Sequence, residues 1–364
     1  MVAMSGGVDS SVTALLLKES GAEIAGLFMK NWEEDDLANG CSAEEDAADA
    51  RAVAELLGIP FHARNFAPEY WEQVFAEFLN ELAAGRTPNP DVLCNREIKF
   101  KVFLEHAQDL GAEQMATGHY ARRDEVDGRF RLLKGADPDK DQSYFLFMLD
   151  QQQLAHARFP VGELKKSQLR GMARRAGLPN AVKKDSTGIC FIGERNFDAF
   201  IDNYLKSQPG EILTPAGDRI GTHNGLIHYT LGQRRGLGIG GVRGYPEAPW
   251  FVVHKELEGN RLFVTQDPDD PHLLSSRLSA GRLTWIAGAP PEPGRRLTAK
   301  IRYRQPDQGA TLAELDVDAD SMTLVFDRPQ RAVTPGQSVV LYDGDECLGG
   351  GIIADSDRRV PEIA

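Results

Sequence analysis

The feature that most constrains the fold of this chain is a glycine- and serine-rich loop near its start, Ser5-Gly6-Gly7-Val8-Asp9-Ser10-Ser11. The loop follows a short apolar segment, Val2–Met4, and precedes a run with apolar residues at helical spacing. A loop between a strand and a helix lies at the carboxyl end of the strand, where open parallel sheets bind ligands. Glycines let the backbone approach a phosphate, and the free N–H groups of the following helix point at it. The loop therefore predicts an α/β domain with a phosphate site at this edge.

The loop differs from two common phosphate-binding motifs. It lacks the Gly-Lys-Ser/Thr ending of a Walker A loop and the spaced glycines of a dinucleotide fold. We expect its serines to add hydroxyl donors. Asp9 would repel a phosphate directly, so we expect this carboxylate to act through a Mg²⁺ ion. A simple serine–glycine turn is the alternative, and the order of strand, loop and helix disfavours it.

Alternating strand and helix patterns continue through the first half of the chain. They indicate a parallel sheet with helices on both sides. The predicted strands are Val2–Met4, Ile24–Met29, Phe61–Phe66 and Gln114–Thr117. The predicted helices cover about 10–20, 42–57, 68–82 and 96–110. The helix from Ser42 opens with a Ser-x-x-Glu capping box, and Gly58 ends it.

The pattern changes in the second half. Tyr120–Leu133 predicts a hairpin that turns at Asp127-Gly128. A helical, basic stretch is predicted over 141–177. Later segments alternate as in a small antiparallel barrel or sandwich, with strands at Thr298–Tyr303, Ala310–Val317, Ser321–Phe326 and Ser338–Tyr342. A length of 364 residues suits two or three domains. We predict an α/β catalytic domain at 1–200, a small β-rich central domain at 201–272 and a C-terminal β-barrel at 273–364.

Charge and apolar content restrict the possible partners. The net charge of −13 alone argues against a nucleic-acid partner. Two local basic clusters nevertheless leave RNA binding open. The first contains Lys165, Lys166, Arg170, Arg174, Arg175, Lys183 and Lys184, and the second contains Arg295, Arg296, Lys300, Arg302 and Arg304. No apolar stretch of about 18 residues and no signal-peptide pattern is present, so we expect a cytoplasmic protein without membrane contact.

Four cysteines, Cys41, Cys94, Cys190 and Cys347, are too scattered for a disulfide framework, and no Cys-x-x-Cys pair exists. A zinc or iron–sulfur site is therefore not expected. The two prolines of 87–95 predict a loop around Cys94, with a helix starting close to the cysteine, where a thiolate would be stabilised. Cys190 follows two lysines and Gly188. From these residues alone, each cysteine is either a reactive thiol or a small buried hydrophobe.

The loop resembles the signature of the PP-loop ATP pyrophosphatases, which cleave ATP between the α and β phosphates and adenylate a carbonyl oxygen. Further motifs extend the resemblance to nearly the whole chain. They are Asn89-Pro90-Asp91 with Cys94, Gly118-His119-Tyr120, Lys140-Asp141-Gln142-Ser143, Gly188-Ile189-Cys190-Phe191, Gly232-Gln233-Arg234-Arg235-Gly236-Leu237 and Arg302-Tyr303-Arg304. As a set they resemble the tRNA-specific 2-thiouridylase family. The first strand begins almost at Met1, whereas family members carry several more apolar residues there.

The resemblance implies a role for each matched residue. Cys190 receives sulfur as a persulfide, and Cys94 is the second catalytic cysteine, which pairs with Cys190 as a disulfide when sulfur leaves. The residues implied to hold ATP are Ala3, Met4, Ser5, Gly6, Gly7, Val8, Asp9, Ser10, Met29 and Gly118. Asn89, Pro90 and Asp91 are implied to contact the target uridine at the wobble position. The residues implied to contact tRNA are His119, Lys140, Asp141, Gln142, Arg302, Tyr303 and Gln337.

The implied reaction uses ATP as a co-substrate with Mg²⁺ and no tightly bound cofactor. Adenylation of the C2 oxygen of uridine makes it a good leaving group, and persulfide sulfur then replaces it. The implied partners are tRNA and a persulfide sulfur-donor protein, either a cysteine desulfurase or a relay protein. Two alternatives remain. One is a PP-loop enzyme that forms a C–N bond and needs no paired cysteines, and the other is an ATP-binding regulator without catalysis.

Overall fold

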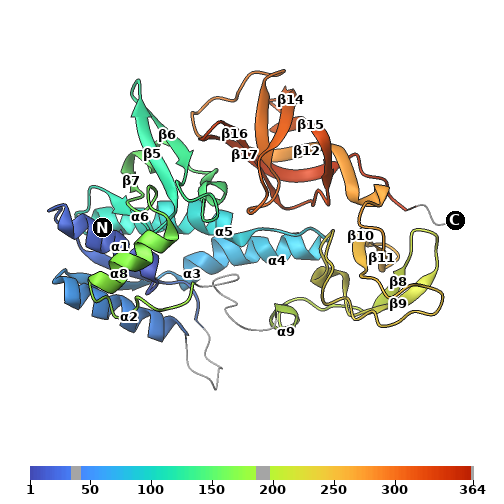
Figure 1. Ribbon diagram of the computed structural model, residues 1–364, viewed down its shortest axis with the longest axis horizontal. Coiled ribbons are helices and arrows are strands. Elements are labelled where there is room, and N and C mark those ends of the chain that lie inside the picture. Colours follow the sequence, from blue (N-terminus) through green and yellow to red (C-terminus); the bar gives the residue numbers. More distant parts are fainter. Residues whose placement is uncertain (34–41, 186–196, 362–364) are drawn as a thin grey trace.

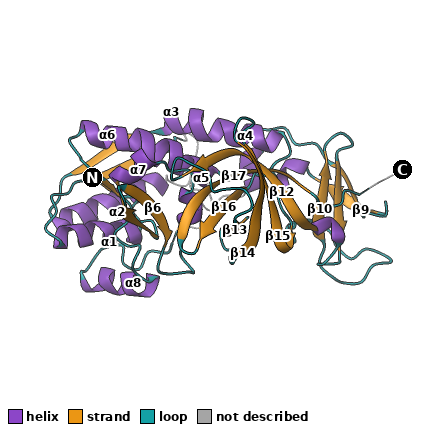
Figure 2. Ribbon diagram, turned by 90° about the horizontal axis from the view of Figure 1, so that it is seen from above, coloured by secondary structure: helices purple, strands orange, loops and turns teal. Residues whose placement is uncertain are grey.

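A computed structural model describes residues 1–33, 42–185 and 197–361, which form three sheets (Figure 1). The first is a parallel sheet in the N-terminal part of the chain. The second is a small sheet in the middle of the chain. The third is an antiparallel sheet that closes into a barrel. Figure 2 shows most helices gathered around the first sheet, with the barrel strands beside them.

The parallel sheet confirms the predicted α/β class. Its strand order is β3-β2-β1-β4-β7, and every neighbouring pair runs parallel. The strands are β1 (Val2–Ala3), β2 (Gly26–Lys30), β3 (Phe61–Asn65), β4 (Met115–Ala116) and β7 (Ala157–Arg158). The first four match the predicted strands. The short strand β7 was not predicted, because it lies inside the stretch that was expected to be helical.

Helices cover both faces of this sheet, as predicted. One face packs with Val2 and Phe28 against α1 (Val8–Glu19), α2 (Ser42–Leu57) and α8 (Lys166–Arg175). The other face packs with Leu27 and Met115 against α3 (Ala67–Tyr70) and α6 (Phe103–Asp109). Because side chains alternate along a strand, Leu27 and Phe28 enter opposite cores.

Two longer helical segments contain π-helical turns. The first runs through α3, a π-helical segment at Trp71–Phe75 and α4 (Ala76–Ala83). The second runs through α5 (Pro90–Leu93), a π-helical segment at Cys94–Val102 and α6. The predicted loop around Cys94 is therefore wrong. Pro90 lies in the first turn of α5, where its missing N–H costs nothing, and the Asn89 side chain caps the helix by accepting from the Asp91 N–H.

The predicted helix over 141–177 is also wrong, because it is several short elements. These are a 3₁₀ turn at Ser143–Leu146, α7 (Gln151–His156), β7 and α8. Asp150 starts α7 with a capping box and therefore separates it from the preceding turn. Pro160 and Gly162 lie between β7 and α8, and a Cβ at Gly162 would overlap the Ala121 carbonyl. The many basic residues of this stretch made it look like one continuous helix in the sequence, so these breaks were not predicted.

The middle sheet has the order β10-β11-β8-β9 and follows α9 (Phe197–Ile201). Its strands are β8 (Gly210–Leu213), β9 (Arg219–His223), β10 (Phe251–Glu256) and β11 (Arg261–Thr265). Gly85, two positions after the end of α4, lies against the side chain of Leu257, which follows β10. A Cβ at position 85 would come within 2.7 Å of that side chain. The segment through α4 thus reaches from the parallel sheet to the middle sheet (Figure 1).

The barrel runs β12-β15-β14-β13-β16-β17 and closes by pairing β12 with β17. Its strands are β12 (Leu274–Trp285), β13 (Arg296–Lys300), β14 (Gln308–Asp316), β15 (Ser321–Arg331), β16 (Ser338–Asp343) and β17 (Glu346–Ser356). The predicted hairpin is present as β5 (Ala121–Val126) and β6 (Arg129–Lys134), and it turns at Asp127-Gly128. It pairs with β17, so this N-terminal hairpin extends the C-terminal sheet. The three predicted domain limits stay a prediction.

Candidate active site

The glycine-rich loop connects β1 to α1 and is held by its own hydroxyl groups. Gly6 has φ +74°, and a Cβ there would overlap the Asp46 carbonyl of α2, so the position requires glycine. Ser10 Oγ accepts from the Ser5 N–H at 3.1 Å and donates to the Gly7 carbonyl at 3.0 Å. Ser11 Oγ donates to the same carbonyl at 2.9 Å. In this structure the Ser10 and Ser11 hydroxyls therefore shape the loop, and they do not point outward as free donors.

The loop is also held by Asn180, a side chain that the sequence analysis did not single out. Asn180 is 3% exposed and lies just beyond the end of α8. Its Nδ2 donates to the Gly6 carbonyl and to Ser11 Oγ, each at 2.8 Å. Asn180 thus connects the loop to the chain after α8. No spacing or motif in the sequence marked it.

Gly118 and His119 connect the loop to the helical segment that carries Cys94. A Cβ at Gly118 would lie 2.8 Å from the Ser10 nitrogen, so glycine allows the segment after β4 to pass close to the loop. The His119 ring lies 6.0 Å from the ring of Phe100 in the π-helical segment. Burial, with the nearby Lys99 charge, lowers the pKa of His119 well below 6.5. His119 is therefore neutral at pH 7 and acts as a hydrogen-bonding group, not as a cation.

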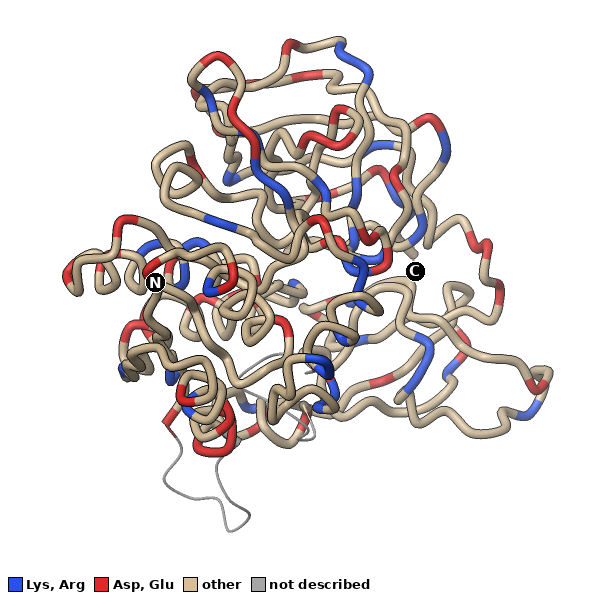
Figure 3. Tube along the Cα trace, turned by 60° about the vertical axis from the view of Figure 1, so that its left-hand side comes forward, with Lys and Arg blue, Asp and Glu red and all other residues tan. Residues whose placement is uncertain are grey.

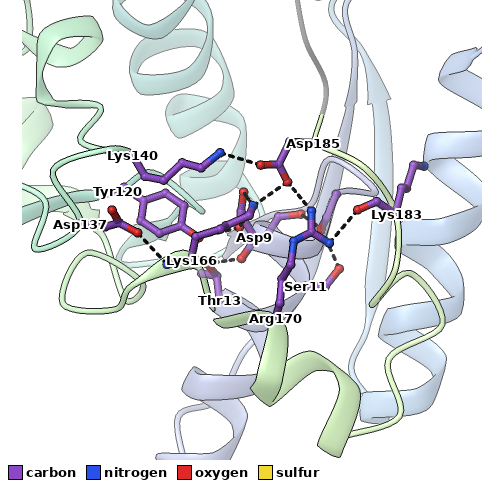
Figure 4. Close-up of polar contacts among 12 residues, drawn as sticks. Asp9, Ser11, Thr13, Tyr120, Asp137, Lys140, Lys166, Arg170, Lys183 and Asp185 are labelled. Atoms are coloured by element: carbon purple, nitrogen blue, oxygen red, sulfur yellow. Dashed lines mark hydrogen bonds and ion pairs between the residues drawn. The ribbon is translucent and has the colours of Figure 1, made fainter. Parts of the chain in front are cut away.

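Asp9 is the charged residue of the loop, and it already has a cation beside it (Figure 4). Lys166 Nζ lies 2.7 and 2.8 Å from the two Asp9 carboxylate oxygens. Tyr120 donates its hydroxyl to Asp9 Oδ1 at 2.9 Å. Within residues 1–33, 42–185 and 197–361, no group of three or more His, Cys, Asp and Glu side chains is arranged as a metal site. The predicted Mg²⁺ role of Asp9 stays a prediction.

Asp185 is the second carboxylate of this network. It contacts the Nζ of Lys166 at 2.7 Å, Lys140 at 2.8 Å and Arg170 at 2.7 Å. Burial alone would raise the pKa of Asp185, but the hydrogen bonds from Lys140 and Lys166 lower it to about 2. The carboxylate is therefore ionised throughout the physiological range.

The first predicted basic cluster is consequently less free than its sequence suggested. Lys166 and Arg170 are engaged by Asp185, and Lys183 forms ion pairs with Asp46 and Asp49 of α2. Lys165 is exposed and forms no ion pair within the part of the chain that the structure describes. Figure 3 shows basic and acidic positions interspersed over the part of the chain that the structure describes.

Cys94 lies inside the helical segment that begins at Pro90. It is 1% exposed and belongs to the core beside the parallel sheet. Because Asp91 and Cys94 are three positions apart, they share one side of the helix. The helix starts four residues before the thiol, so stabilisation of a thiolate at a helix start is weaker than the sequence predicted. Cys190 and Cys41 lie outside the described residues.

Cys347 lies on β17 and is fully buried, which raises the pKa of its thiol. Its position between β6 and the barrel is that of a core residue. Among the implied ATP contacts, Ala3 and Met4 lie at the end of β1, and Met29 lies on the neighbouring strand β2. These positions surround the carboxyl edge of the sheet at the loop.

Two residues implied to contact tRNA point into the protein. Asp141 is 5% exposed, and its Oδ2 lies 3.3 Å from the Nζ of Lys300, which is 8% exposed. Its Oδ1 accepts from the backbone N–H groups of Gly135 and Ser143 at 3.0 and 3.1 Å. Gln142 Oε1 accepts from the Tyr120 N–H at 2.9 Å. In this structure both residues hold the 135–143 turn in place.

The implied contacts from the barrel gather at the junction with the N-terminal domain. The ring of Tyr303 is tilted against the ring of Phe145, with ring centroids 4.4 Å apart. Arg302 Nη2 donates to the Ala332 carbonyl at 2.8 Å. Gln337 Nε2 donates to the Thr87 carbonyl at 2.7 Å. Lys140, His119 and the barrel residues thus lie on elements that meet around the site.

Three groups meet at Thr87, two positions ahead of Asn89. Its N–H donates to the Pro335 carbonyl at 3.0 Å, and its Oγ1 lies 3.2 Å from Thr230 Oγ1. Gln337 binds its carbonyl. The turn that leads into Asn89-Pro90-Asp91 is therefore fixed by both the barrel and the middle part of the chain.

Comparison with known protein families gives matches that together cover most of the chain. The sequence matches three family descriptions, which are a tRNA methyl transferase HUP domain over residues 1–194, a tRNA methyl transferase PRC-barrel domain over 198–266 and an aminomethyltransferase β-barrel domain over 275–353. A tRNA-specific 2-thiouridylase of Chromohalobacter salexigens is 59% identical over 97% of this chain and 91% of its own length. The chain belongs to the tRNA-specific 2-thiouridylase family.

Other members of the family agree with this assignment. A tRNA-specific 2-thiouridylase of Pseudomonas syringae is 58% identical over 97% of this chain and 93% of its own length. One of Xanthomonas campestris is 58% identical over 98% of this chain and 94% of its own length. The domain descriptions mention methyl transfer, whereas these relatives are named for thiolation. Because the relatives match nearly the full chain, they decide the family, and this confirms the resemblance drawn from the motifs.

Within the part of the chain that the structure describes, no helix is both long and apolar enough to cross a membrane. In this member of the 2-thiouridylase family, the fold consists of a parallel sheet with the loop at its edge, a small middle sheet and a closed barrel.

Proposed function

We propose that this chain catalyses the ATP-dependent 2-thiolation of uridine at wobble position 34 of tRNA, with release of AMP and pyrophosphate. One observation carries the proposal. Contacts run from the phosphate loop through Gly118 and His119 to the helical segment that carries Cys94. An enzyme that activates a base with ATP and then attacks it with sulfur needs both sites beside one substrate. Relatives named tRNA-specific 2-thiouridylases match 97% of the chain.

The first step is adenylation of the base. The C2 oxygen of uracil is an amide-type oxygen and a poor leaving group, and its bond to the α-phosphorus of ATP replaces the bond to pyrophosphate. The N–H groups and dipole of α1 bind the leaving pyrophosphate. Asp9 and Asp185 both lie against one cation, the Lys166 ammonium, so carboxylate oxygens suited to Mg²⁺ are present. Asp9 would hold that ion, which supplies positive charge against the phosphates.

The second step exchanges oxygen for sulfur. The terminal sulfur of a Cys190 persulfide attacks C2, and AMP leaves with the former C2 oxygen. Cys94 attacks the Cys190 sulfur, the S–S bond to the transferred sulfur breaks, and the products are 2-thiouridine and a Cys94–Cys190 disulfide. In the alternative order, Cys94 attacks first and the released hydrosulfide adds to C2. A thiol reductant restores both cysteines in either case.

Asn89, Pro90 and Asp91 would contact the extruded base, since proteins read single-stranded RNA loops from splayed bases. The Asn89 cap and the contacts on Thr87 hold this turn in a fixed shape. We further propose a cytoplasmic enzyme that receives sulfur from a persulfide donor protein, a cysteine desulfurase or a relay protein. The tRNA would also contact His119, Lys140 and the barrel.

The decisive experiment is mass spectrometry of tRNA nucleosides after incubation with ATP, Mg²⁺ and a persulfide donor. We expect 2-thiouridine from the wild type and none from Cys94→Ala or Cys190→Ala. Cys347→Ala is the matched control, because Cys347 is as buried as Cys94 but lies on β17. Asp9→Ala should release no pyrophosphate.

The same experiment separates the alternatives. An enzyme that forms a C–N bond would remain active after Cys190→Ala and would add nitrogen, not sulfur. A regulator would bind ATP and release no pyrophosphate with tRNA present. Either result would overturn the proposal.

A further inference from the structure

We propose that Lys166 is a further phosphate-binding group of the loop and that its ammonium leaves Asp9 to bind the pyrophosphate part of ATP. This inference rests on the proposed function, because it assigns a residue to the same ATP site. Lys166 lies on α8, 157 positions along the chain from Asp9. Only the fold brings the two together.

The position of the ammonium is suited to a phosphate. Asp9 is in the first turn of α1, whose free N–H groups face the anion site. Lys166 Nζ contacts both Asp9 oxygens, so it lies beside that helix end. Lys166 also lines a cavity of about 380 Å³ with Lys140, Lys165 and Ser167. Lys166 therefore both contacts the loop through Asp9 and lines this cavity.

The carboxylate that Lys166 would leave keeps another partner. Tyr120 donates its hydroxyl to Asp9 Oδ1 at 2.9 Å. The Asp9 carboxylate therefore keeps a hydrogen bond after the Lys166 ammonium has left. A metal ion that arrives with ATP would find Asp9 available at the same moment.

The lysine also stays anchored when it leaves Asp9. Asp185 lies 2.7 Å from Lys166 Nζ and is itself fixed by Lys140 and Arg170 (Figure 4). The side chain of Lys166 is only 12% exposed, so the ammonium has little freedom to turn into solvent. Asp185 therefore positions Lys166, and a small rotation of the side chain exchanges one anion for another.

Electrostatics favours the exchange. An ammonium attracts a pyrophosphate more strongly than a single carboxylate, because the Coulomb energy at a given distance grows with the charge of the anion. The alternative is that the Lys166–Asp9 ion pair serves only to stabilise the fold, and this alternative is the weaker one. Removing two charges from water costs about as much as their attraction returns, so partly buried ion pairs contribute little net stability.

The test is calorimetric titration of the full chain with inorganic pyrophosphate in the absence of tRNA and metal. Lys166→Gln should weaken binding roughly ten- to hundredfold, the range expected for one hydrogen bond between charged groups. Lys165→Gln is the matched control, because it is the preceding residue, lines the same cavity and is exposed. It should leave the affinity unchanged. Lys166→Arg keeps the charge, preserves most of the affinity and guards against misfolding of the glutamine variant.

A double variant separates the exchange from simple charge repulsion. Asp9→Asn removes the competing carboxylate, so pyrophosphate should bind more tightly, and this gain should disappear in Asp9→Asn with Lys166→Gln. Equal affinity of wild type and Lys166→Gln, or a full gain in the double variant, would overturn the inference. The inference alone fails if Lys166→Gln binds pyrophosphate normally while the wild type makes 2-thiouridine. The proposed function fails if the wild type releases no pyrophosphate with tRNA and ATP, whatever the titration shows.

Discussion

Replacing Asp141 tests whether this residue holds the fold together or contacts tRNA. Its carboxylate is 5% exposed and accepts from Gly135, Ser143 and Lys300. Asp141→Ala leaves the Lys300 ammonium buried without its nearest carboxylate, a change that costs about 3–5 kcal/mol. Because Asp307 lies 3.7 Å from the same ammonium and offsets part of the loss, we expect about 3 kcal/mol. Asp141→Asn keeps an oxygen for the two N–H groups and should lose about half as much.

The assay is urea unfolding followed by tryptophan fluorescence, with tRNA affinity measured on the same samples. Asp139→Ala is the control, because Asp139 is an exposed carboxylate two positions away on the same turn. It should unfold as the wild type does. The reasoning is refuted if Asp141→Ala loses less than about 1 kcal/mol, the size expected of a surface change, while tRNA affinity falls about tenfold. Asp141 would then be a tRNA contact, as the resemblance implied.

Three further predictions concern the site and its surroundings. Arg302→Ala and Lys165→Ala should each weaken tRNA binding and reduce the slope of log affinity against log salt by about 0.7–0.9, the range for one lost phosphate contact. An unchanged slope would show that neither side chain contacts a phosphate. His119 has a pKa well below 6.5, so below that pH the unfolded chain binds a proton at this histidine that the folded chain does not, and the contribution of His119 should lower the wild-type stability by about 1 kcal/mol between pH 6.5 and 5.5. His119→Gln removes this term, so urea midpoints of variant and wild type that fall equally would contradict the burial argument. Gly336 has φ +90°, and a Cβ there would lie 2.9 Å from the Thr87 nitrogen, so Gly336→Ala should raise KM for tRNA more than KM for ATP in a 2-thiouridine assay. Equal changes in both constants would show that the Thr87 turn has no special link to the base.

Local signals in the sequence predicted the parts of the site that are local. The glycine-rich loop and Gly118 each follow a predicted strand, so their places at strand ends could be inferred. The strands that flank the loop were marked by apolar runs. The helix at Pro90 was missed because proline is a breaker in a helix interior but a good first residue, and the sequence alone did not show which applied.

The rest depends on contacts between distant residues. Lys166 and Asn180 meet the loop from 157 and 174 positions away, so no spacing rule could have found them. Asp141 looked like a surface residue in a polar motif, yet a lysine from β13 neutralises it inside the protein. The basic cluster misled for the same reason, since its acidic partners Asp46 and Asp49 lie on α2.

The pairing of β6 with β17 has a consequence for synthesis of the chain. Arg129 on β6 contacts Glu346 on β17, and 217 positions separate them. At ~5–20 residues per second, roughly 10–40 s pass between translation of the two strands. During that time the hairpin β5–β6 presents an open edge, the kind of surface that pairs with other chains. The last strand to leave the ribosome therefore completes a sheet begun in the first half of the protein, and a chain cut before β17 keeps that edge exposed.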